Sequence, residues 1–180
     1  MTTYVALLRS INVGGHKMVP MKELRSLSER LGFIQAHTLL QSGNLIFRSE
    51  VRSAKNLEKM LETETEKYFG FAVEYFVRSA EEWHDIIARN PFQAYARKDP
   101  AHLVAILLKE KVVPGGVKAL QASIEGSEEV RGGSRHVYVI YPDGIGKSRV
   151  TLPVIESKLG TSGTGRNWNT VVKLGGEIKE

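Results

Sequence analysis

The order of the predicted strands and helices constrains the fold of this 180-residue chain more than any other feature. Tyr4–Leu8 is an apolar run typical of a buried strand. A helix pattern, two short strands, a second helix pattern and the extended segment Phe71–Arg78 follow it. The order β-α-β-β-α-β over residues 3–78 is that of the ferredoxin-like fold, in which two right-handed βαβ units interleave. The first half of the chain therefore predicts an α+β fold.

Local cues place the ends of these elements. Proline suits the first turn of a helix, glycine suits its end, and serine suits its N-cap. On these cues the first helix runs from Pro20 to Gly32, the second from Ser53 to Gly70, and the strands between them occupy Thr38–Gln41 and Leu45–Arg48.

The second half of the chain repeats the order, but it lacks the last strand. It begins with the apolar strand Leu103–Lys109 and ends with a helix over Pro153–Leu159. A glycine-, serine- and threonine-rich loop, Gly160–Gly165, is expected where the last strand would stand. A final helix that bears Trp168 follows the loop. The second half is thus predicted to be ferredoxin-like with an extra helix.

The domain organisation follows from the repeat. We predict an N-terminal ferredoxin-like subdomain with a following helix over residues 1–92, and a C-terminal ferredoxin-like subdomain over residues 93–180. The polar, proline-terminated segment Ala94–Pro100 is the expected linker, and Ser79-x-x-Glu82 is a capping box for the helix before it. A single compact unit remains the alternative.

Charge and composition limit the classes of function. The chain has 25 basic and 20 acidic side chains, and its whole excess of +5 falls within Arg131–Lys173. The absence of cysteine excludes disulfide scaffolds, cysteine nucleophiles and thiolate zinc sites. Neither a signal peptide nor an apolar run long enough for a membrane helix is found. We therefore expect a cytoplasmic protein with no membrane partner.

The first candidate site is the loop that follows the first strand. Its paired glycines allow backbone N–H groups to approach an anion, and two cations flank them. In a βαββαβ unit the first two strands are parallel, so the hairpin after the second strand should lie beside this loop. A tight turn with solvated charges is the alternative. The candidate residues are Arg9, Asn12, Gly14, Gly15 and Lys17 in the loop and Gln41, Ser42, Gly43 and Asn44 in the hairpin.

The second candidate site is the loop Asp143–Arg149, which follows a strand and precedes a helix. It contains Gly-Lys-Ser, but Tyr141 stands where a Walker A motif needs glycine. The motif therefore favours a simpler anion site at Lys147 and Ser148, or a solvated turn, over a nucleoside triphosphatase.

The third candidate site is the motif Arg166-Asn167-Trp168-Asn169. Arginine offers a bidentate fork to an anion, and tryptophan offers a stacking face. The alternative is that Trp168 packs the last helix onto the sheet and that Thr164 caps that helix. The histidines have no metal-site spacing, so no metal site is expected.

These segments carry a resemblance to a bacterial family known only as a domain of unknown function. The matching text is YVALLRSINVGG at Tyr4–Gly15, LGFIQAHTLLQSGNLIF at Leu31–Phe47 and TGRNWNTVVKL at Thr164–Leu174. The segment YPDGIGKSR is also similar to the family. Two positions depart from the usual motif, since Ser10 replaces glycine and Gly165 replaces threonine. The resemblance implies two ferredoxin-like subdomains and implies no activity.

Three hypotheses on function remain open. The first is a protein that binds a small anionic or phosphorylated ligand in a cleft lined by the glycine-rich loops. The second is an enzyme on a small anionic substrate, although the sequence identifies no general base, catalytic residue or cofactor. The third is a structural or regulatory protein. Nucleic acid is a further candidate partner, but the RNA-binding signature of ferredoxin-like sheets is absent.

Overall fold

The computed structural model describes residues 1–179 and contains two four-stranded antiparallel sheets. The first sheet has the strand order β2-β3-β1-β4, the ferredoxin-like order, and two helices accompany it. Its elements are β1 (Thr2–Leu8), α1 (Met21–Arg30), β2 (Ile34–Thr38), β3 (Asn44–Ser49), α2 (Ala54–Phe69) and β4 (Tyr75–Ser79).

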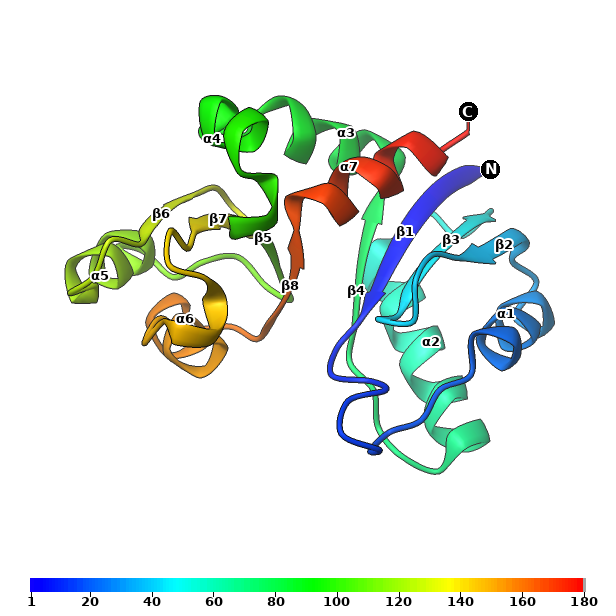
Figure 1. Cartoon of the computed structure of the whole chain (residues 1–180). Coiled ribbons are helices and arrows are strands. Elements are labelled where there is room, and N and C mark those ends of the chain that lie inside the picture. Colours follow the sequence, from blue (N-terminus) through cyan, green and yellow to red (C-terminus); the bar gives the residue numbers. More distant parts are fainter. Residues whose placement is uncertain (180) are drawn as a thin grey trace. The chain divides into compact units, whose positions relative to one another are not determined.

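Helices α1 and α2 cover one face of the first sheet (Figure 1). Alternate side chains of β1, among them Tyr4, Ala6 and Leu8, enter the core that these helices close. The alternation follows from the pleat of a strand, which directs successive side chains to opposite faces. The opposite face of β1 and β3 carries Thr3 and Arg48, which are direct cross-strand partners.

The second sheet has the strand order β6-β7-β5-β8, the same topology as the first. Its helices α5 and α6 contribute Leu120 and Ile155 to a separate core with Val104 and Val139. Its elements are β5 (Leu103–Leu108), α5 (Gly116–Ser123), β6 (Glu129–Gly132), β7 (His136–Ile140), the 3₁₀ turn η2 (Ile145–Lys147), α6 (Leu152–Leu159) and β8 (Gly163–Asn167). Two ferredoxin-like folds are therefore present.

The prediction that the second repeat lacks its last strand is wrong. Gly163–Asn167 forms β8 and pairs antiparallel with β5, from Leu108↔Gly163 to Val104↔Asn167. A β-carbon at Gly163 would lie 3.1 Å from the Leu107 carbonyl oxygen, so glycine permits this close approach. The glycine-rich sequence of β8 has low β-propensity, so its extended conformation depends on the pairing with β5.

Two further predictions of element bounds are corrected. The expected linker Ala94–Pro100 instead forms α4 (Gln93–Lys98) and begins the 3₁₀ turn η1 (Pro100–His102). The second strand lies before the predicted Thr38–Gln41, because Leu40 has a left-handed φ of 62° that ends the extended run. The capping box is confirmed: Glu82 Oε2 accepts from Ser79 N at 2.8 Å, and Ser79 Oγ accepts from Glu82 N at 3.2 Å.

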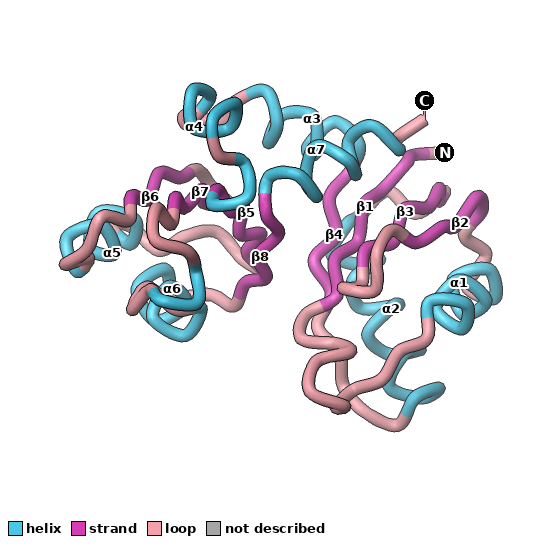
Figure 2. The backbone as a smooth tube through the Cα atoms, viewed as in Figure 1, coloured by secondary structure: helices cyan, strands magenta, loops and turns pink. Residues whose placement is uncertain are grey.

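The chain divides into two compact units (Figure 2). Unit 1 comprises Met1–Asp85 and the chain from Leu174 onward, and unit 2 is the continuous segment Ile86–Lys173. Both divisions fall inside helices, α3 (Ala80–Ala88) and α7 (Trp168–Glu177). In the chain order, unit 2 is therefore an insertion within unit 1, and the chain passes between the units once in α3 and once in α7.

Candidate functional site

Asn12 holds the first candidate loop in place. Its Nδ2 donates to the carbonyl oxygens of Val19 at 3.1 Å and Gln41 at 2.9 Å, and its Oδ1 accepts from Val19 N at 2.8 Å. The loop and the hairpin thus lie side by side, as the parallel direction of the first two strands predicts. Because both ends of the amide are bonded to the chain, Asn12 shapes the loop.

Arg9 and Lys17 lie at the edge of this loop and line a hollow of about 360 Å³ with Ser10, Ala72 and Glu74. Arg9 forms an ion pair with Glu74 at 3.2 Å, and Lys17 Nζ donates to the Ala72 carbonyl oxygen at 3.0 Å. The carboxylate offsets one of the two positive charges. Ser10 has φ 53°, in the left-handed region that glycine adopts more readily than serine.

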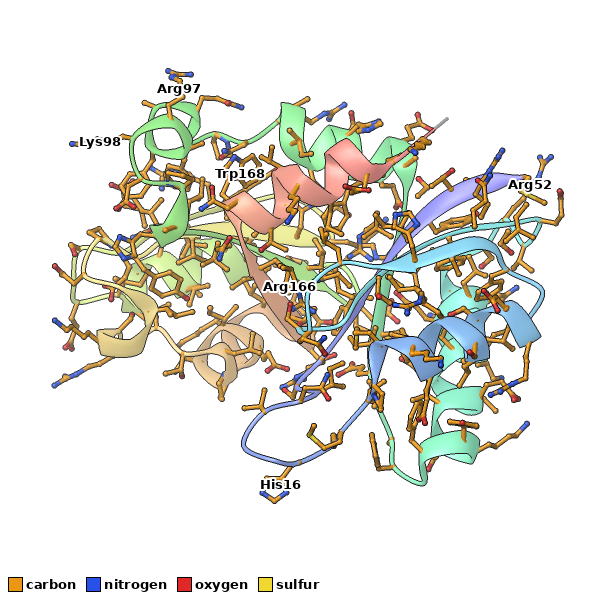
Figure 3. The ribbon with its side chains drawn as sticks, turned by 45° about the vertical axis from the view of Figure 1, so that its right-hand side comes forward. His16, Arg52, Arg97, Lys98, Arg166 and Trp168 are labelled. Atoms are coloured by element: carbon orange, nitrogen blue, oxygen red, sulfur yellow. The ribbon has the colours of Figure 1, made fainter. Side chains whose placement is uncertain are left out.

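The tip of the loop is glycine-rich and exposed. Gly14 and Gly15 have φ values of 59° and 76°. Figure 3 shows His16 projecting from this tip into solvent, and its side chain is exposed. The left-handed glycines and the exposed histidine are typical of an open turn.

The side-chain amide of Asn44 holds the hairpin after β2 together. Asn44 is fully buried, and its Nδ2 donates to Leu39 O at 2.8 Å and to Ser42 Oγ at 3.0 Å. Gly43 O accepts from Leu8 N at 2.9 Å, which ties the hairpin to β1. Gln41 is exposed. These bonds give Ser42, Gly43 and Asn44 a structural role.

The Gly-Lys-Ser segment lies in unit 2 among charges of both signs. Ser148 Oγ donates to the Glu128 carboxylate and accepts from Val150 N at 2.9 Å. Lys147 is exposed and lines a broad hollow of about 590 Å³ with two further cations, Arg149 and Lys158, and three carboxylates, those of Glu125, Glu128 and Asp143. The positive and negative charges balance, so the hollow has no excess of positive charge to favour an anion.

The Arg-Asn-Trp-Asn motif spans the junction of β8 and α7 in unit 2 (Figure 3). Arg166 Nη1 donates to Thr164 Oγ1 at 3.0 Å and to Gly165 O at 2.8 Å. Burial lowers the pKa of Arg166 to about 10, so the guanidinium keeps its charge at neutral pH. Asn167 Oδ1 accepts from Thr170 N at 3.1 Å and caps α7. The expected cap, Thr164, is instead a buried residue of β8.

Trp168 is the first residue of α7 and is 5% exposed. Its ring lies 6.2 Å from the ring of Tyr138, centroid to centroid, within unit 2. This position agrees with the packing alternative and leaves the ring little surface for stacking on a ligand. Asn169 is exposed on the same helix.

Parts of the second and third candidate segments meet at one hollow of about 420 Å³ in unit 2. Gly144 and Ile145 line it from the second candidate segment. Asn167 lines it from the third, together with Gly165 just before that segment. A β-carbon at Gly165 would lie 3.1 Å from Val104 Cγ1, so a glycine at this position keeps the wall open. The remaining lining residues are Ala101, His102, Val104, Ile106, Tyr141, Leu152 and Ile155.

His102 is the group in this hollow with acid–base chemistry. Its Nδ1 lies 2.7 Å from Asp99 Oδ2, and its side chain is 42% exposed. Because a carboxylate accepts, Nδ1 carries the hydrogen, and the neutral ring keeps Nε2 as a proton acceptor. A β-carbon at Gly144 would lie 3.8 Å from Nε2, so this nitrogen faces the Gly144 segment. Burial, followed by the charge of Asp99, raises the pKa of Tyr95 beside this pair.

Sequence reasoning missed Asp99 and His102. The spacing Asp-Pro-Ala-His before a buried strand was the available signal, since it places the two side chains one turn apart in η1. Tyr141 also lines the hollow, and its backbone N–H donates to His102 O at 2.8 Å. Its side chain is buried, and its hydroxyl donates to Val150 O at 3.0 Å. Burial and the nearby Glu128 raise the pKa of Tyr141 to about 12, so it stays a neutral donor.

Residues 1–179 hold neither a metal-ligand cluster nor a helix suited to crossing a membrane. No group of three or more histidine, aspartate or glutamate side chains is placed to hold a metal ion in this part of the chain. Within the same residues, no helix combines the length and the apolar character that a membrane crossing requires. Tyr75 and Phe76, the aromatic residues of β4, are both buried, so neither offers a ring to a nucleic-acid base.

Comparison with known proteins gives a family and a fold but no activity. A family model described as a protein of unknown function (DUF1697) matches residues 1–138. A solved structure of a conserved bacterial protein from Streptococcus pneumoniae is 27% identical, with a TM-score of 0.79, and the match covers 99% of each chain. A search of curated proteins found no match.

Proposed function

Since the chain belongs to DUF1697, a bacterial family of unknown function, we propose a function from its geometry: unit 2 binds a small organic acid beside His102. The observation that carries the proposal is an imidazole, oriented by Asp99 at 2.7 Å, on the wall of a hollow of about 420 Å³. Ligand sites of this type are apolar cavities with a few convergent polar groups.

The chemistry of the walls selects the ligand class. Val104, Ile106 and Ile155 supply an apolar surface for the body of the ligand. The carboxylate of the ligand is already ionised at neutral pH, so His102 Nε2 takes up its proton from solvent. The imidazolium then donates from Nε2 to the ligand anion and from Nδ1 to Asp99. The ligand is therefore a small anion with an apolar body, held between the Gly144 and Gly165 segments.

Benzoate is a suitable probe because it joins an apolar ring to a carboxylate. We expect saturable amide shifts at Ile106, Gly144 and Gly165 in nuclear magnetic resonance titrations. His102→Gln should weaken binding roughly tenfold, as expected for loss of a charge-assisted bond. His84→Gln is the matched control, because His84 is exposed and outside the hollow. Equal affinity of the two variants would contradict the proposal.

Two further variants sharpen the test. Asp99→Asn removes the carboxylate that stabilises the imidazolium, so benzoate should lose its charged partner at Nε2 and bind more weakly while the fold is kept. Gly165→Val extends a side chain toward Val104 and should block the hollow, whereas Gly176→Val meets no atom within 4 Å and should not. If benzoate shows no saturable shifts at all, the ligand-binding function is refuted in favour of a structural or regulatory role.

An enzyme on a small anionic substrate is the second candidate, and the Asp99–His102 pair favours it. The same pair can remove a proton from water or from a substrate as a general base. Hydrolysis of 4-nitrophenyl acetate measures this capacity. Turnover above that of His102→Gln, retained in His84→Gln, would support the enzyme, and equal rates in all three proteins would remove it.

A further inference from the structure

Unit 1 contains a second polar hollow, which none of the sequence motifs identified. It has a volume of about 480 Å³ and lies against the face of the first sheet that is opposite α1 and α2. Three segments of unit 1 contribute to it: β1 with β3, the bulged strand β2, and the end of the chain. The lining residues are Thr3, Gln35, His37, Ile46, Phe47, Arg48, Glu177 and Lys179.

Arg48 is the central cation of this hollow. It lies on β3 between its cross-strand partners Thr3 and Ile34, and its side chain is half-buried. Its Nε is buried and has no hydrogen-bond partner among residues 1–179. A buried donor without a partner is costly, and native proteins rarely keep one without a functional reason. A guanidinium in this state is suited to bidentate recognition of an oxyanion.

The neighbouring charges are positive in sum. Lys179 adds a second cation, and its backbone oxygen accepts from Thr3 Oγ1 at 3.2 Å, which anchors the end of the chain. His37 Nδ1 donates to Gln35 O at 3.1 Å, so its Nε2 is the nitrogen that can take up a proton, and it lies 3.8 Å from Glu177 Oε2. Glu177 is the one carboxylate among the lining residues, so the two permanent cations outnumber it.

The backbone beside Arg48 is distorted in a way that forms this hollow. The register of β2 shifts between Ile34 and His37, and Gln35 between them has φ 53°. A left-handed φ is unfavourable for a glutamine, and bulges often re-aim side chains next to binding sites. Both Gln35 and His37 line the hollow as a result. Strain of this kind is typical of functional positions.

We propose that this hollow binds a phosphate group, free or as a small phosphomonoester. The guanidinium of Arg48 takes two oxygens, Lys179 offsets the remaining charge, and the side-chain amide of Gln35 supplies a neutral donor. This site is separate from the organic-acid hollow, because its residues belong to unit 1 and carry no part of that proposal.

The test is a titration with inorganic phosphate at constant ionic strength, followed by the Arg48 Nε–H resonance and by the amides of Gln35 and His37. A saturable shift is expected with phosphate and not with an equal ionic strength of chloride. Glycerol 2-phosphate distinguishes the two sources: tighter binding than phosphate indicates a phosphomonoester, and weaker binding indicates the free ion. The absence of a saturable shift with either probe would overturn the proposal.

The phosphate affinities of two arginine variants distinguish binding at a specific site from general attraction to positive charge. Arg48→Gln should weaken phosphate binding roughly tenfold, since it removes the bidentate fork. The matched control is Arg52→Gln, which removes the same charge from an exposed arginine outside the hollow (Figure 3) and should change the affinity less than about twofold. Equal losses in the two variants would refute the site.

A second variant guards against misfolding of Arg48→Gln. Lys179→Gln replaces an exposed side chain near the end of the chain, where substitution is well tolerated. It should weaken phosphate binding several-fold and leave the amide spectrum of the first sheet unchanged. If Lys179→Gln binds phosphate with unaltered affinity, the proposed second contact is wrong and the site fails.

Discussion

Gly43 lies where the hairpin packs closely against Leu8 of β1 and Ile11 of the following loop. A β-carbon on it would lie 2.7 Å from Ile11 Cδ1 and 2.9 Å from Leu8 Cβ, and its φ is 81°. Gly43→Ala therefore combines a left-handed alanine with an overpacked core, and we expect it to lower the free energy of unfolding by about 2–4 kcal/mol. Urea denaturation measures the loss.

Gly70→Ala is the matched control for this substitution. Gly70 has the same φ of 81°, but an added β-carbon meets no atom within 4 Å. The control isolates the backbone cost, which is about 1 kcal/mol. If the two variants were equally stable, the contact between Gly43 and the β1 segment would not be as tight as the structure has it.

At the scale of secondary structure, both units protect an edge strand with a helix side chain. On β4 the N–H groups of Tyr75 and Val77 donate to the carboxylates of Glu62 at 3.0 Å and Glu58 at 2.9 Å, both from α2. On β6 the N–H of Val130 donates to Gln121 Oε1, from α5, at 2.7 Å. Edge strands with unpaired N–H groups invite pairing with other chains, and these side chains occupy them.

This edge protection is testable at Glu62. Glu62→Ala leaves the Tyr75 N–H without its acceptor and should cost about 1–3 kcal/mol, the range for bonds to a charged group. Glu62→Gln keeps an acceptor oxygen and should retain roughly half of that stability. The control is Glu66→Ala, one turn later on the exposed side of α2, where we expect a change within about 0.5 kcal/mol. Chemical denaturation that ranks Glu66→Ala with Glu62→Ala would contradict the role.

Elements with local signals could be predicted from the sequence, and elements made by pairing could not. The capping box at Ser79 and the glycine caps at Gly70 and Gly160 depend on neighbouring residues alone, and each is present. β8 was missed because its Gly-Thr-Gly sequence becomes a strand only by pairing with β5. Gly144 and Gly165 line one hollow, but they meet only through long-range contacts, so the sequence could not predict that they lie together.

At the scale of the whole molecule, the candidate residues fall into two groups that belong to different units. The Arg9 loop and the Asn44 hairpin lie in unit 1, and their polar groups chiefly bond to the chain itself. The Gly144 loop and β8 lie in unit 2 and line a hollow with His102. The sequence could identify glycine-rich segments, but it could not separate the glycines that permit a turn from Gly165, which lines the hollow beside His102.

The two cores predict how the molecule opens. One core joins β1 with α1 and α2, and the other joins β5 with α5 and α6. Segments with their own core tend to open as separate cooperative units. We therefore expect Gly43→Ala to reduce the hydrogen-exchange protection of amides in β1 and β3 and to leave β5 and β7 unchanged. Equal loss in both sheets would show a single cooperative unit instead. Separate opening would mean that ligand binding at His102 raises the protection of unit 2 alone, because a ligand stabilises only the unit that binds it.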